Sequence, residues 1–334
     1  MMSIAADLRE HLEFVASAML LGNVVPVLGA GANLCDRTSG QHWSPGASLP
    51  DGAELAYWLA QKLKCDVANT GDLLSVSQYA GVIRGVGPLY VQLRELFNRD
   101  SYAIPSLHRF VAGLPARLEK RGLPPRHQLI VTTNYDELLE RALEEAGEPF
   151  DVVRYLANGP DRGRFVHEPS DSDPDKERGP HVIRTPRKYG AVSPEIRTVV
   201  LKIHGGLDRR DAAHDSFVIT EDDYIDYLTR TSPNELIPAK LLAKLLNSHF
   251  LFLGYAMRDW NLRVLLHRIW TLRDLTWESW AVQRTVEAFD KKMWAMQRVE
   301  LREMLLSDYV RDLSVCVEYA IDESIADQHG DQHS

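Results

Sequence analysis

The chain has 334 residues, 45% of them hydrophobic and 25% charged, and a formal net charge of −9. This composition is typical of a globular protein and excludes a disordered chain, while the negative charge argues against a broad nucleic-acid-binding surface. Because no run of about 18 apolar residues and no secretory leader is present, we expect a cytoplasmic protein that does not contact the membrane.

The first third of the chain reads as mostly helical. Apolar residues at helical spacing predict a helix over 4–21, and the β-rich run that follows predicts a buried strand over 24–28. Three further helices are expected at 51–66, 72–98 and 104–118.

A second junction of strand and helix follows. The β-branched run 128–133 predicts a strand, and ELLERALEEAG predicts a helix that closes at Gly147. Apolar runs predict further strands at 150–155, 199–203, 217–219, 250–253, 277–282 and 313–318, with helices between most of them.

Continuously apolar strands alternating with helices favour an α/β fold with a doubly wound, mainly parallel sheet covered on both faces. Its ligand crevice is expected beyond the carboxyl ends of the strands. We expect a single domain over 1–330, in which 157–197 forms an irregular, Pro- and Gly-rich excursion with a short hairpin, and residues 321–334 form a frayed polar tail.

Unusual polar residues gather at four predicted strand ends. The first is GAGAN, residues 29–33, where glycines could let backbone N–H groups approach a pyrophosphate at the start of a helix. Position 34 is Leu, so the G-x-G-x-x-G fingerprint is incomplete, and a tight turn between packed elements is an equally physical explanation.

The second strand end carries Asn134 and Asp136. Either side chain could cap the following helix, which contributes about 1 kcal/mol. Since one cap is enough, the other side chain would be free to face the crevice.

The third strand end is His204-Gly205-Gly206, and the fourth is Gly254-Tyr255 with Asp259. A histidine after a strand is more often structural than catalytic. Two glycines after it would remove side chains that crowd the imidazole, which favours a histidine with access to a ligand, and its ordinary pKa of about 6.5 suits proton transfer.

The three cysteines, Cys35, Cys65 and Cys316, lack paired spacing. They predict neither a disulfide framework nor a four-thiolate zinc site, and we expect no metal.

Taken together, these stretches resemble the bacterial sirtuin-like NAD hydrolases, a divergent branch of the sirtuin superfamily found in anti-phage defence. The resemblance spans residues 22 to 283, and its stretches are VPVLGAGAN, LPDGAELAYWLA, LIVTTNYDELLERAL, VVLKIHGGLD, SFVITEDDYIDYL, FLFLGYAMRDWNLRVLL and WAVQ.

The resemblance implies a Rossmann-like NAD-binding domain with an inserted helical module at about 35–126. Asn134 and His204 would be catalytic. The implied NAD-binding residues are Gly29, Ala30, Gly31, Ala32, Asn33, Asp136, Gly254, Tyr255 and Asp259.

The implied activity is hydrolysis of NAD to nicotinamide and ADP-ribose by an abortive-infection effector. Protein-deacylating sirtuins carry a four-cysteine zinc module that three isolated cysteines cannot supply. An NAD-dependent deacylase or ADP-ribosyltransferase, and a non-catalytic NAD or ADP-ribose sensor, stay open as alternatives. The resemblance and the toxicity of such an activity together imply control by homo-oligomerisation or by a separately encoded ATPase, such as a DNA translocase.

Overall fold

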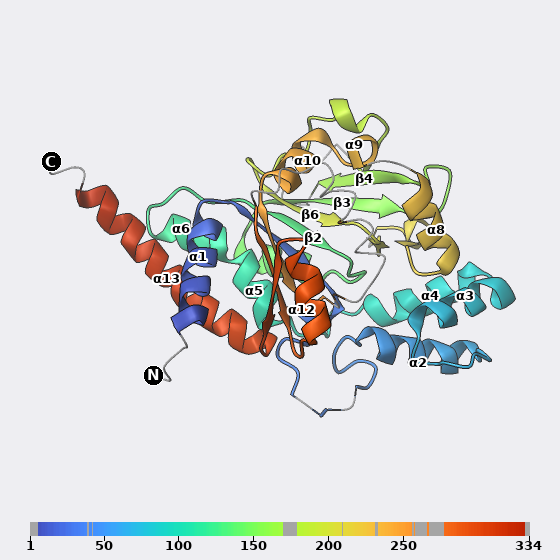
Figure 1. The fold of residues 1–334 in the computed structure, drawn as a ribbon. Helices are drawn as coiled ribbons and strands as arrows, with labels where there is room; N and C mark the ends of the chain where they lie inside the picture. Colours follow the sequence, from blue (N-terminus) through green and yellow to red (C-terminus); the bar gives the residue numbers. More distant parts are fainter. Residues whose placement is uncertain are drawn as a thin grey trace.

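The computed structural model describes residues 6–38, 40–41, 43–169, 179–208, 210–230, 233–255, 257, 266 and 277–330. Within these ranges, nine strands form one sheet in the order β11-β10-β9-β1-β2-β6-β3-β4-β5 (Figure 1). The strands are β1 (Val24–Leu28), β2 (Leu129–Thr132), β3 (Phe150–Leu156), β4 (Arg164–Pro169), β5 (His181–Ile183), β6 (Thr198–Lys202), β9 (His249–Leu253), β10 (Ser279–Gln283) and β11 (Val299–Glu303).

The strands from β11 to β3 all run parallel, and β4 and β5 add an antiparallel edge. This edge is the hairpin expected within the excursion. A separate two-stranded ribbon pairs β7 (Gly205–Gly206) with β8 (Ser216–Phe217), so only the first residue of the strand predicted at 217–219 is in a strand.

Helices cover both faces of the sheet because alternate side chains of each strand point to opposite sides. In β9, Phe250 and Phe252 join one apolar cluster, and Leu251 and Leu253 join the other. The first cluster packs on α8 (Glu221–Arg230), α9 (Pro233–Leu236), α10 (Ala239–Leu246) and α12 (Ala288–Ala295). The second packs on α1 (Ala6–Leu20), α5 (Ser106–Ala112), α6 (Leu114–Lys120), α7 (Leu138–Ala146) and α13 (Leu306–Gly330).

The predicted fold class is therefore confirmed: the chain is α/β, with a Rossmann-like, doubly wound and mainly parallel sheet. Short 3-10 turns complete the described elements, at η1 (Ala30–Leu34), η2 (Pro186–Lys188) and η3 (Ala212–His214).

Three helices between β1 and β2 form a module with its own apolar cluster. They are α2 (Gly52–Leu63), α3 (Leu73–Arg84) and α4 (Val86–Phe97), at the lower right of Figure 1. Asp51 begins α2 with a capping box to Glu54. The single helix predicted over 72–98 is instead divided at Gly85, whose φ of +80° is left-handed. In contrast, α5 and α6 pack into the main core.

Two predictions for the C-terminal part were wrong. Residues 313–318 form no strand, and 321–330 form no frayed tail, because both belong to α13. Leu313, Val317 and Ile321 are fully buried at a spacing of four, which places them on one helical face. The sequence analysis also missed β11. None of the described helices is long and apolar enough to cross a bilayer.

The turns after β1 and β9 cross in direct backbone contact. Gly31 N–H donates to Gly254 O at 2.8 Å, and Gly29 N–H donates to Leu253 O at 3.2 Å. A Cβ on Gly254 would lie 2.0 Å from Ala32 N, and Gly254 also has a φ of +66°. Glycine is thus required there by both backbone conformation and space.

We predict that Gly254→Ala lowers the free energy of unfolding by about 3 kcal/mol or more, because it adds a clash to the cost of a left-handed residue. Gly147→Ala is the matched control, since Gly147 has a φ of +69° and nothing within 4 Å of its Cβ. Urea unfolding of both variants should show a smaller loss, of about 1–2 kcal/mol, for the control. Equal losses of stability in the two variants would contradict the close contact between the turns at Gly254.

His108, on α5, is almost fully buried, and its Nδ1 has no hydrogen-bond partner among the described residues. Burial lowers the pKa of His108 from 6.5 to about 4. The unfolded chain therefore binds a proton below pH 6.5 that the folded chain excludes, and stability falls as the pH drops from 6.5 toward 4.

We expect His108 to lower the free energy of unfolding by about 3 kcal/mol as the pH falls from 6.5 to 4. The measurement is urea unfolding across that range for the wild type and His108→Leu. The leucine variant should lose less stability on acidification, and an identical pH dependence would contradict the buried neutral state.

Candidate NAD site

A cavity of about 580 Å³ opens beyond the carboxyl ends of the central strands. Since β1 lies between β2 and β9, this is the point where the sheet changes its direction of winding, and ligands of such folds bind there. Of the residues predicted to form the site, those that line the cavity are Gly29, Ala30, Gly31, Asn33, Asn134, Asp136, His204, Gly254 and Tyr255.

One predicted site residue among those described does not line the cavity. Ala32 has a fully buried side chain in the apolar core under the sheet. Asp259 lies outside the described residues.

The GAGAN segment forms a tight turn at the wall of the cavity. Cβ atoms on Gly29 and Gly31 would lie 2.6 and 2.7 Å from Gly254 O, so both glycines are needed for a tight crossing of two turns. Both residues also line the cavity. Because Gly31 N–H already donates to Gly254 O, that amide is committed to the protein itself.

Asn134 and Asp136 divide their tasks as expected. The Asp136 carboxylate accepts the first amide of α7, Leu138 N–H, at 3.0 Å. Asn134 instead donates its side-chain amide to Gly29 O at 3.1 Å, and its Oδ1 is buried without a partner among the described residues. The amide therefore offers an acceptor oxygen, which a ligand hydroxyl or water can satisfy.

The side-chain amide of Asn33 is bonded in the same way, through its nitrogen. Its Nδ2 donates to Asp136 Oδ2 at 2.7 Å, and its Oδ1 is likewise buried without a partner in the described structure. Asn33 and Asn134 thus both line the cavity, and each has a buried amide oxygen without a partner among the described residues. A ligand that brings hydroxyl or amide donors would satisfy both.

His204 follows β6 and lines the same cavity, with an exposed fraction of 4%. Two aromatic rings of α8 lie edge-on to the imidazole, with centroids at 5.4 Å for Tyr224 and 5.8 Å for Tyr227. The backbone of His204 is fixed by Val218 N–H, which donates to its carbonyl at 2.9 Å.

Gly205 and Gly206 are both closely packed against neighbouring residues. A Cβ on Gly205, whose φ is +77°, would lie 2.0 Å from Ser216 O, and a Cβ on Gly206 would lie 2.9 Å from Lys202 Cε. The two glycines therefore permit the β7–β8 pairing and the packing of a lysine.

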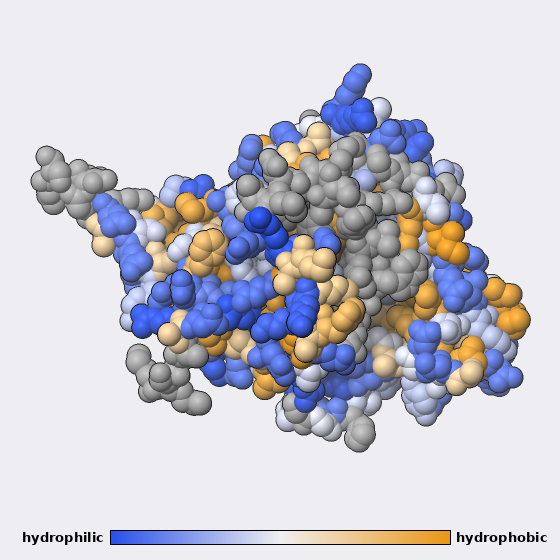
Figure 2. All heavy atoms as spheres, in the orientation of Figure 1, coloured by the Kyte–Doolittle hydropathy of each residue, from blue (hydrophilic) through white to orange (hydrophobic). Residues whose placement is uncertain are grey.

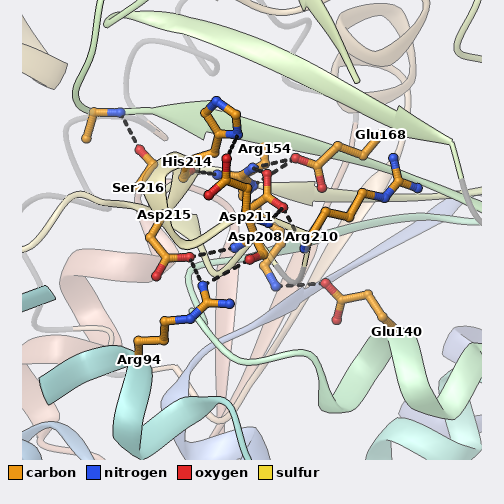
Figure 3. Close-up of polar contacts among 12 residues, drawn as sticks. Arg94, Glu140, Arg154, Glu168, Asp208, Arg210, Asp211, His214, Asp215 and Ser216 are labelled. Carbon is orange, nitrogen blue, oxygen red and sulfur yellow. Dashed lines mark hydrogen bonds and ion pairs between the residues drawn. The ribbon is translucent and has the colours of Figure 1, made fainter. Parts of the chain in front are cut away.

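A buried ionic network holds the loop that follows His204 (Figure 3). Arg154 on β3 pairs with Asp208 at 3.1 Å and with Glu168 on β4. Arg94 on α4 pairs with Asp215 at 2.7 Å, and Asp215 also accepts Asp208 N–H. Burial raises the pKa of Glu168. The network joins the helical module to the His204 loop.

The module also binds the strand after this loop through main-chain oxygens. Ser77 Oγ donates to Ile219 O at 2.7 Å, and Tyr90 OH donates to Phe217 O at 3.3 Å. Tyr135, which neighbours Asn134, donates to Val218 O at 2.8 Å. Both candidate catalytic residues are therefore anchored to one short segment.

Sequence reasoning missed part of the cavity wall, namely Arg37, Asp51, Tyr224, Gln283, Arg284 and Ser307. Gln283 could have been found, because it ends the strand WAVQ and strand ends form the crevice. Arg37 pairs with Glu54 of α2, a contact between loop and module that local sequence patterns do not reveal. Among the described residues, no three His, Cys, Asp or Glu side chains gather as a metal site.

Comparison of the sequence with those of known proteins identifies relatives of this chain. The chain is similar to proteins named NAD(+) hydrolase ThsA. The Enterococcus faecium protein is 27% identical over 232 residues, which cover 68% of this chain and 38% of that protein. The Acinetobacter baumannii protein is 28% identical over 229 residues, covering 67% and 37%. The Bacillus cereus protein is 27% identical over 219 residues, covering 65% and 36%.

This chain spans less than two fifths of the length of these relatives. Residues 128–301, about half of the chain, match the SIR2-like domain, and this match includes the turns that carry Asn134, His204 and Gly254. The chain therefore belongs to the SIR2-like domain family.

Proposed function

We propose that the chain binds NAD in this cavity and hydrolyses the bond between nicotinamide and ribose, releasing nicotinamide, ADP-ribose and a proton. The observation that carries the proposal is that Asn134 and His204, from two different strand ends, line one cavity, and that the Asn134 amide oxygen has no partner among the described residues. The similarity to proteins named NAD(+) hydrolase supports the same reaction.

The cavity suits NAD in size and polarity. Its volume of about 580 Å³ lies within the usual range of small-molecule sites. The ribose hydroxyls and the carboxamide of NAD carry hydrogen-bond donors, which match the unpaired oxygens of Asn33 and Asn134. Asp136, held by Asn33, adds a carboxylate at the same wall.

The chemistry demands little acid catalysis. Nicotinamide leaves as a neutral molecule from a cationic ring, so the protein has to stabilise an oxocarbenium-like ribose and direct a water molecule. In this proposal, Asn134 Oδ1 accepts a hydrogen bond from the water or from a ribose hydroxyl. His204 takes a proton from one of them. Fixed placement of these two groups supplies much of the rate.

The proposed role in the cell rests on the same similarity to NAD hydrolases. NAD loss would harm the cell, so we propose a cytoplasmic abortive-infection effector that is silent until it is triggered. Self-association or a separately encoded ATPase would then complete or release the site.

We predict that Asn134→Ala and His204→Ala each lower the rate of nicotinamide release by about 100-fold or more, because each removes a group placed at the reacting sugar. The assay incubates purified protein with NAD, with and without candidate activating partners, and follows nicotinamide by chromatography. His214→Ala is the control, since this histidine lies in the same loop with 68% of its side chain exposed.

The control should keep full activity, and circular dichroism should show that all variants remain folded. Wild-type turnover in both site variants would contradict the assignment. Calorimetric binding of NAD without nicotinamide release would instead identify a sensor. Transfer of ADP-ribose to protein, or formation of O-acyl-ADP-ribose from an acylated peptide, would identify a transferase or a deacylase.

A further inference from the structure

Lys202, at the end of β6, carries a buried charge that the proposed chemistry does not use. Its side chain is only 2% exposed. The ammonium donates to the main-chain carbonyl of Asp136 and to Glu140 Oε1, the latter at 2.7 Å. Figure 3 shows Glu140 in this contact, below the ionic network.

Stability alone is a poor explanation for this ion pair. Removing two charges from water costs several kcal/mol per ion, and well-packed apolar residues often replace such pairs without loss. Both acceptors of Lys202 lie on one segment, which comprises the turn that carries Asn134 and Asp136 and the first residues of α7.

Lys202 also contacts the segment that follows His204. Its stem fills the space beside Gly206, where a Cβ would lie 2.9 Å from Lys202 Cε. Leu207 N–H, the next amide, donates to Tyr135 O at 3.2 Å. The lysine therefore lies between two segments, one that carries Asn134 and one that follows His204. Both of these residues line the cavity.

We propose that Lys202 is a positioning residue, which fixes the turn 133–137 relative to His204. The ladder between β2 and β6 does not do this, because its last bond, Ile203 N–H to Thr132 O at 3.0 Å, precedes the turn. The inference rests on the proposed NAD hydrolysis for its effect on rate, but its structural part can be tested without activity.

The informative variant is Lys202→Met with Glu140→Leu, which removes the pair without leaving one buried charge unpaired. We expect it to stay folded, to lower kcat on the order of 100-fold through misplacement of Asn134, and to change KM much less. Hydrogen exchange of the amides in 133–137 should become faster, while exchange in β1 should not change.

Glu148→Gln is the matched control. Glu148 is also a buried carboxylate with polar partners, His127 at 2.7 Å and Thr198, but it lies at the opposite ends of the strands. This variant should lower the melting temperature and leave kcat and the exchange of 133–137 unchanged.

Two outcomes decide the inference. A double variant with wild-type kcat and wild-type exchange in 133–137 would overturn it. If the wild type itself releases no nicotinamide, the proposed function fails, and the exchange measurement alone decides: faster exchange confined to 133–137 supports the role of Lys202, and unchanged exchange rejects it.

Discussion

The site depends on the close crossing of two turns, those that follow β1 and β9. The crossing exists because Gly29, Gly31 and Gly254 lack side chains, so one backbone hydrogen-bonds directly to the other. The same crossing orients Asn134, since the Gly29 carbonyl accepts its side-chain amide, and the oxygen of that amide has no partner among the described residues. The position of the Gly29 backbone thus determines which end of the Asn134 amide is bonded within the protein.

The polar groups around the site are also held by hydrogen bonds and ion pairs within the protein. Asn33 holds Asp136, which also caps α7, and the loop beyond His204 is fixed by Arg154 and Arg94. Each of these contacts joins residues that are far apart in the chain. The cavity is therefore formed by tertiary structure, from short segments that are each ordinary turns.

Much of the fold could be predicted because central strands are continuously apolar and helices alternate with them. β1 and β9 are examples, as all five residues of each are buried. The strand-end rule likewise identified nine of the residues that line the cavity. Prediction failed where local and tertiary preferences disagree. Residues 313–318 contain strand-forming residues, but Leu313 and Val317 pack as a helical face in the core. The wall supplied by Arg37 depends on a contact with α2 that sequence patterns do not encode.

The helical module has one mechanical consequence. It is joined covalently between β1 and β2, and it is also bound to the segment after His204 through Ser77, Tyr90 and Arg94. At the C-terminal end of α3, Val82 and Ile83 are exposed, and Figure 2 shows apolar surface at its lower right, where Figure 1 places this part of the module. A force applied to this end of the module would thus reach both sides of the cavity through these two connections.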